Sequence, residues 1–202
     1  DHPNDFQYPG GPPVRPYDAA GWTPAYTMGL EFDRILEPFD GPFETIAYGE
    51  EQKHKGSFTK LAGAVGYTFS TKENASYILI NDLLKEGIEV EKNSEYFYVA
   101  ASDKSVSILE NAAAKNGVKI TGVQQKLNIG AVALKPSRIA LWDVYGGSMP
   151  SGWTRWIFEQ YHFPFTVVYA KEIDAGNLKS KYDVILFVGG AIPAFRAEAG
   201  SN

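Results

Sequence analysis

The sequence predicts a mixed α/β protein in which a small α/β unit precedes part of a doubly wound parallel sheet. Three observations support this fold class. Segments typical of strands and helices alternate from residue 64 onward. Two short apolar runs, 138–144 and 183–190, have the composition of strands buried on both faces of a parallel sheet. A content of 44% hydrophobic and 14% aromatic residues is that of a folded chain.

Residues 1–40 are predicted to form a proline-rich connector arm. The segment DHPNDFQYPGGPPVRPYD contains five prolines among its eighteen residues. Proline has no amide donor and favours an extended conformation in the residue before it. We therefore expect the arm to lie over a surface, with Phe6, Tyr8 and Tyr17 as docking aromatics.

A short helix is expected where the arm ends. Thr23 can cap it and Pro24 suits its first position. The helix should end near Gly29 or continue to Ile35. The aromatic and β-branched content of residues 43–48 then predicts a strand.

Residues 41–135 are predicted to form a small α/β domain with the order β-α-β-β-α-β. Asn74 is expected to cap the first helix and Gly87 to end it, while the second helix should run over 103–116. The expected strands are 64–70, 88–92, 96–101 and 118–123. The order fits a split βαβ domain of the ferredoxin-like type, although two small doubly wound units would give the same order.

Residues 136–202 are predicted to begin a flavodoxin-like domain after a hinge at Lys135-Pro136. The expected elements are strands 138–144, 165–170 and 183–190 and an aromatic helix, 153–161. Three parallel strands are about half of such a sheet, so one edge should lack neighbours. Either N-terminal strands complete the sheet or the natural protein continues, and we favour continuation.

The candidate ligand site lies at the carboxyl ends of the first and third strands of this second domain, where doubly wound sheets form a crevice. Backbone amides, a helix N-terminus and hydroxyls there could hold an anion or a small polar ligand. The simpler interpretation is that the glycines serve tight turns and that Ser151 caps the helix. The predicted ligand-binding residues are Asp143, Tyr145, Gly146, Gly147, Ser148, Ser151, Gly189 and Gly190.

The sequence provides no convincing catalytic or metal-binding set. It has no cysteine, and no serine occurs in a G-x-S-x-G context. His2 and Asp5 superficially resemble a zinc ligand pair, but they lack a third rigid ligand. His162 is assigned a structural role at the end of the aromatic helix. Helical spacing predicts that Trp153 and its neighbouring aromatics pack in the core.

Charge and hydropathy exclude two classes of partner. The net charge is -5 and the basic residues are scattered, whereas a nucleic-acid or anionic membrane site requires a concentrated basic face. No apolar run of about 18 residues is present, so no membrane span is predicted.

Two segments resemble a known family. LWDVYGGSMPSGWTRWIFEQYHFPFTVVYAKEIDAGNLKSKYDVILFVGGAIP is similar to the region downstream of the peptidase domain in large bacterial zinc carboxypeptidase A-like proteins. DHPNDFQYPGGPPVRPYDAAGWTPAYTMGLEFDRI resembles the connector that follows the same peptidase domain. In that family the downstream unit is similar to a class I glutamine amidotransferase domain of flavodoxin type.

The resemblance implies an accessory region without chemistry of its own. The amidotransferase nucleophile is a cysteine, which this chain lacks, so the likeness implies fold and not glutaminase activity. The family's zinc and catalytic residues are expected upstream of Asp1, in a carboxypeptidase domain that would be the partner of this region. No cofactor is expected in this chain. A secreted or periplasmic parent metallopeptidase, a hydrolase, is implied, and an independent small-ligand binding module is the alternative.

Overall fold

The computed structural model describes residues 6–14, 24–50, 54–126 and 130–189. Contacts divide the chain into two units, residues 1–50 and 51–202. In the described part of the first unit, the one helix is α1 (Pro24–Thr27), and Gly29 follows it with φ 63°. The helix thus takes the shorter of the two predicted lengths. His2, Asp5, Tyr17 and Thr23 lie outside the described residues.

The strand predicted for residues 43–48 is wrong. These residues adopt no regular structure, and Phe43, Ile46 and Tyr48 are exposed. A strand needs a paired neighbour and a surface to cover, and local composition supplies neither.

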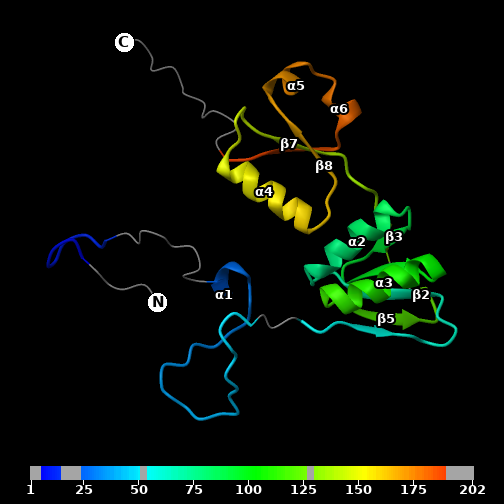
Figure 1. The fold of residues 1–202 in the computed structure, drawn as a ribbon, viewed down its shortest axis with the longest axis horizontal. Coiled ribbons are helices and arrows are strands. Elements are labelled where there is room, and N and C mark those ends of the chain that lie inside the picture. Colours follow the sequence, from blue (N-terminus) through cyan, green and yellow to red (C-terminus); the bar gives the residue numbers. More distant parts are fainter. Residues whose placement is uncertain (1–5, 15–23, 51–53, 127–129, 190–202) are drawn as a thin grey trace. The chain divides into compact units, whose positions relative to one another are not determined.

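The second unit begins with a six-stranded mixed sheet (Figure 1). Its strand order is β1-β5-β2-β4-β3-β6, and the four central strands are antiparallel to their neighbours within that group. Together with two helices they form the predicted split βαβ arrangement, extended by one strand at each edge. The elements are β1 (Ser57–Thr59), β2 (Gly66–Ser70), α2 (Ala75–Lys85), β3 (Val90–Lys92), β4 (Tyr96–Ala100), α3 (Asp103–Asn116), β5 (Lys119–Val123) and β6 (Val132–Ala133).

The main core lies between this sheet and its two helices. Alternate strand residues point to one face, including Phe69, Phe97 and Ile120, and all three are buried. Leu83 of α2 and Leu109 of α3 are fully buried in the same cluster. Each helix therefore turns one apolar face toward the sheet.

Helices α2 and α3 differ in how their first turns are capped, whereas a glycine follows each of them. Ser102 caps α3 through a reciprocal pair of hydrogen bonds with Ser105, at 2.9 and 3.1 Å. Asn74 occupies the predicted N-cap position of α2, but its side chain makes no capping hydrogen bond there. Gly87 and Gly117 follow the two helices in the left-handed conformation, with φ 73° and 75°.

These two glycines give a matched test of local strain. Gly87→Ala should lower the free energy of unfolding by about 1 kcal/mol, because a Cβ there meets only the left-handed backbone penalty. Gly117→Ala should cost clearly more, because its Cβ would lie 2.5 Å from the carbonyl oxygen of His54. Urea unfolding of both variants measures the difference, and equal losses would contradict the predicted clash.

A separate three-stranded parallel sheet follows. Its order is β8-β7-β9, so the chain moves to one side of β7 and then crosses to the other, as in the first half of a flavodoxin-like sheet. The elements are β7 (Ile139–Trp142), α4 (Met149–Gln160), β8 (Phe165–Val168), α5 (Ala170–Asp174), α6 (Leu178–Lys181) and β9 (Val184–Phe187). The predicted mixed α/β class, with a split βαβ unit and a partial doubly wound sheet, is confirmed.

The three strands are not equally buried. Ala140 and Leu141 of β7 are fully buried, as predicted for a central strand. Val184 and Phe187 of β9 are exposed, so the prediction of a third strand buried on both faces is wrong. Among the described residues, no strand pairs with the outer edge of β8 or β9. No helix within the described ranges is long and apolar enough to cross a bilayer.

An ion pair joins the starts of β7 and β9. Arg138 donates to both oxygens of Asp183, with nitrogen–oxygen distances of 2.8 and 3.0 Å, and its backbone amide adds a bond of 2.9 Å. These hydrogen bonds from Arg138 lower the pKa of Asp183 to about 2. The ionised carboxylate is therefore favoured in the folded state.

This pair predicts a defined acid dependence of stability. A carboxyl whose pKa is depressed on folding contributes stability above its ordinary pKa, and that contribution is lost as the pH falls from about 4 towards 2. Wild-type protein should therefore be more stable than Asp183→Asn at pH 6, with the difference disappearing over that range. Urea unfolding at stepped pH tests this, with the exposed Asp174→Asn as control. A pH-independent difference would refute the assignment.

Candidate functional site

The predicted ligand site lies where β7 and β9 end. Trp142 pairs with Phe187 in the sheet register, so Asp143 and Gly189 follow neighbouring strands at the switch in strand order. Gly146 and Gly147 form the turn into α4, with φ 94° and 85°. Tyr145 is almost fully exposed. Gly190 lies outside the described residues.

Asp143 is the buried centre of this site. Its side chain is only 1% exposed; Oδ1 accepts a hydrogen bond of 2.8 Å from the Val144 amide, and Oδ2 accepts one from the Arg155 guanidinium. Burial alone would raise the pKa of Asp143, but the nearby Ser151 and Ser148 hydroxyls, the Val144 amide and Arg155 together hold that pKa below its ordinary value. The carboxylate is therefore charged at neutral pH and lies at the positive end of α4.

The first turn of α4 differs from its prediction. The helix begins at Met149, earlier than predicted, and Ser148 is the cap, accepting a bond of 3.3 Å from the Ser151 amide. Ser151 is instead fully buried inside the first turn. Its hydroxyl has no hydrogen-bond partner within the part of the chain that the structure describes. The Nε of Arg155 is likewise buried without a partner among the described residues.

The face of α4 that carries Trp153 and Trp156 is exposed. Phe158 points inward and packs on Phe163 and Phe165, with ring centroids 5.6 and 5.4 Å apart. Trp153 and Trp156, predicted to lie in the core, are 64% and 54% exposed. Their rings meet edge to face at 88°, so they do not form the flat platform on which a sugar ring stacks.

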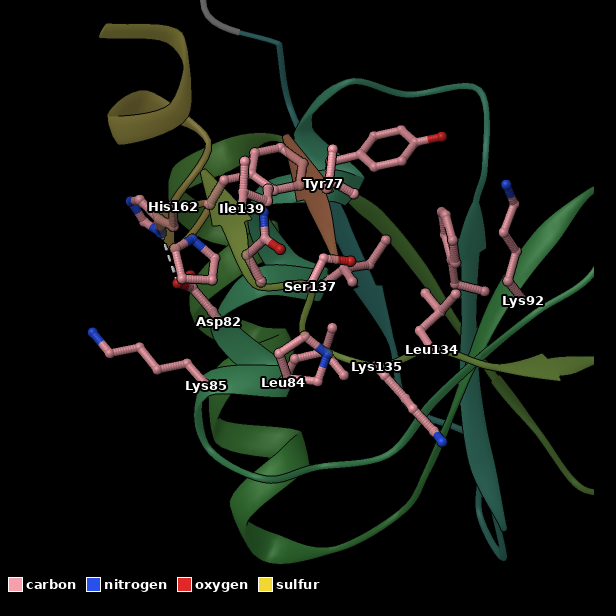
Figure 2. A pocket seen from close by; sticks show the side chains of 17 residues that line it. Tyr77, Asp82, Leu84, Lys85, Lys92, Leu134, Lys135, Ser137, Ile139 and His162 are labelled. Atoms are coloured by element: carbon pink, nitrogen blue, oxygen red, sulfur yellow. Dashed lines mark hydrogen bonds and ion pairs between the residues drawn. The ribbon is translucent and has the colours of Figure 1, made fainter. Parts of the chain in front are cut away.

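A second candidate site was not predicted from the sequence. A cavity of about 880 Å³ is lined by α2 and by the amino ends of β7 and β9 (Figure 2). Asp143 follows the carboxyl end of β7, at the other end of the small sheet. One wall is held by two bonds: Asn81 donates to the carbonyl of Tyr161 at 2.7 Å, and His162 Nδ1 lies 2.6 Å from Asp82 Oδ1. His162 therefore joins the helix α2 to the chain after α4.

This cavity is formed by residues that are far apart in the sequence. Asp82 and His162 are eighty positions apart, and the predicted hinge, Lys135-Pro136, lines the same cavity. The unusual backbone of His162, with φ 57°, indicates a constrained turn. No sequence pattern specified that turn, because glycine is the residue that usually marks a left-handed position.

The titratable residues of the described ranges form no metal centre. No group of three or more histidine, aspartate or glutamate side chains there is arranged to hold a metal ion. Comparison with protein-family models, with curated proteins and with solved structures gives no match for this chain.

Proposed function

We propose that this chain is a non-catalytic accessory region of a zinc metallocarboxypeptidase-like protein, and that it supports or positions the peptidase domain. The observation that supports this most is the uncovered aromatic face of α4. We define this face as Met149, Trp153, Trp156 and Ile157, which share one side of the helix by their spacing and are all exposed.

A protein surface suits this face better than a small molecule. Exposed apolar groups that adjoin one another are typical of interaction sites, and tryptophan is frequent among the residues that dominate binding energy. A helix face is convex, whereas small-molecule sites are concave, so this face is better suited to contact with another protein surface. The edge-to-face contact between Trp153 and Trp156 also holds the two rings in one arrangement before binding, which lowers the entropic cost of association.

The test uses the chain together with the peptidase domain of a protein in which the two occur. Trp153→Ala combined with Trp156→Ala should weaken their association by at least about tenfold, measured by calorimetry. Tyr48→Ala, which removes an exposed aromatic from the other unit, is the control. The chain alone, with added zinc, should not cleave carboxy-terminal residues from peptides. Zinc-dependent cleavage, or unchanged association of the tryptophan variant, would overturn the proposal.

Small-ligand binding around Asp143 is the second candidate function. It is favoured by two buried donors beside a helix N-terminus, the Ser151 hydroxyl and Arg155 Nε, which lack a partner in the described ranges. A ligand with acceptor oxygens would satisfy both. Titration with phosphate and with free amino acids, followed by amide chemical shifts of residues 144–151, tests this. Shifts absent at millimolar ligand would exclude it.

A further inference from the structure

The cavity beside α2 combines an apolar interior with a basic rim. Its volume of about 880 Å³ falls within the range of small-molecule sites. The apolar part is formed by side chains from both sheets and from α2, namely Ile80, Leu84, Phe97, Leu134, Ile139 and Val184. Phe97 and Ile80 are buried, so the floor is built on the rigid core of the six-stranded unit.

The charged groups of the lining are mostly cationic. They comprise the ammonium groups of Lys85, Lys92 and Lys135 and a single carboxylate, that of Asp82. Figure 2 shows Lys92 and Lys135 on one side of the cavity and Lys85 with Asp82 on the other. This local excess of positive charge contrasts with the net charge of -5 of the whole chain.

The three lysines are available to a ligand, whereas the carboxylate is already engaged. Asp82 is bonded to His162 at 2.6 Å. None of the three lysines forms an ion pair with any described residue. An anion entering the cavity would therefore gain attraction from the lysines without breaking an existing pair.

We propose that this cavity binds a small apolar carboxylate, with its hydrocarbon part against the floor and its carboxylate among the rim lysines. Burial of each methylene contributes about 0.8 kcal/mol, so the hydrocarbon supplies most of the affinity. The lysines select the charge of the head group. This binding is separate from the accessory role, because it uses neither Trp153 nor Trp156.

The experiment compares three eight-carbon probes that differ only in the head group. Octanoate, octanol and octylammonium are titrated into the full chain, with amide shifts of residues 80–85 and 134–139 as the readout. Octanoate should bind most tightly and octylammonium most weakly. Absence of octanoate binding, or equal affinity for the three probes, would overturn the proposal.

Charge reversal at the rim tests the role of the lysines. Lys92→Glu combined with Lys135→Glu should weaken octanoate binding by about tenfold and leave octanol binding unchanged. Lys179→Glu, which alters a lysine outside the cavity, is the matched control. All three positions are exposed, so the substitutions should not disturb the fold. Unchanged urea unfolding midpoints verify this. An equal loss in the Lys179 variant, or a parallel loss of octanol binding, would refute the assignment.

Discussion

Asp143→Ala should lower the free energy of unfolding of the three-stranded region by about 3 kcal/mol. Removal of one partner from a buried ion pair leaves the other charge without compensation. Here Arg155 would lose its carboxylate, and the Val144 amide would lose its acceptor. Arg155 is about one-third exposed, which places the cost at the lower end for such pairs. Urea unfolding followed by the fluorescence of Trp142, Trp153 and Trp156 measures the loss.

Two further variants separate charge from packing at this site. Replacement of both Asp143 and Arg155 by leucine should be less damaging than Asp143→Ala, because no unpaired charge remains. Glu159→Gln changes an exposed acid on α4 and should have little effect. If Asp143→Ala lies within 0.5 kcal/mol or so of that control, the ion pair is not a main determinant of stability.

Phe97→Ala should lower the free energy of unfolding by about 3 to 5 kcal/mol. The ring is fully buried, and its centroid lies 5.4 Å from that of Phe69 and 5.7 Å from that of Tyr77. Truncation removes these contacts and leaves a void, because the surrounding strands and helices can only partly relax. Far-UV circular dichroism during urea unfolding measures the effect.

A second phenylalanine replacement separates the effect of burial from the effect of losing an aromatic ring. Phe43→Ala removes an exposed phenylalanine from residues without regular structure and should change stability by less than about 0.5 kcal/mol. Phe97→Leu should fall between the two, since leucine retains part of the buried volume. A loss below about 1 kcal/mol for Phe97→Ala would show that the core around β4 repacks freely.

Sequence patterns correctly predicted those helices and strands that pack against another element of the fold. The bounds of α3 match the prediction, because the Ser102 cap and Gly117 are local devices that require nothing from the rest of the chain. Strands such as β4 follow from their own aromatic and β-branched residues, although the three central residues of β4 are all buried and do not alternate. The parallel order of the small sheet follows from the helix between β7 and β8 and from the handedness of such connections.

The remaining features depend on which neighbours are present. Helical spacing shows that Trp153 and Trp156 share a face, but it does not show that Phe158 covers the sheet in their place. The apolar composition of β9 indicates a strand without indicating whether both of its edges are paired. For the candidate site, the position of Asp143 was predicted, whereas its pairing with Arg155 and the cavity beside α2 require three-dimensional contacts.

The open edge of β9 has a consequence for the protein in solution. Val184 and Phe187 border backbone amides and carbonyls that no described strand engages. An extended peptide of matching alternation can add to such an edge by backbone pairing. Concentrated samples should therefore tend toward strand-mediated polymers, and short peptides that copy the sequence of β9 should act as chain terminators of that growth.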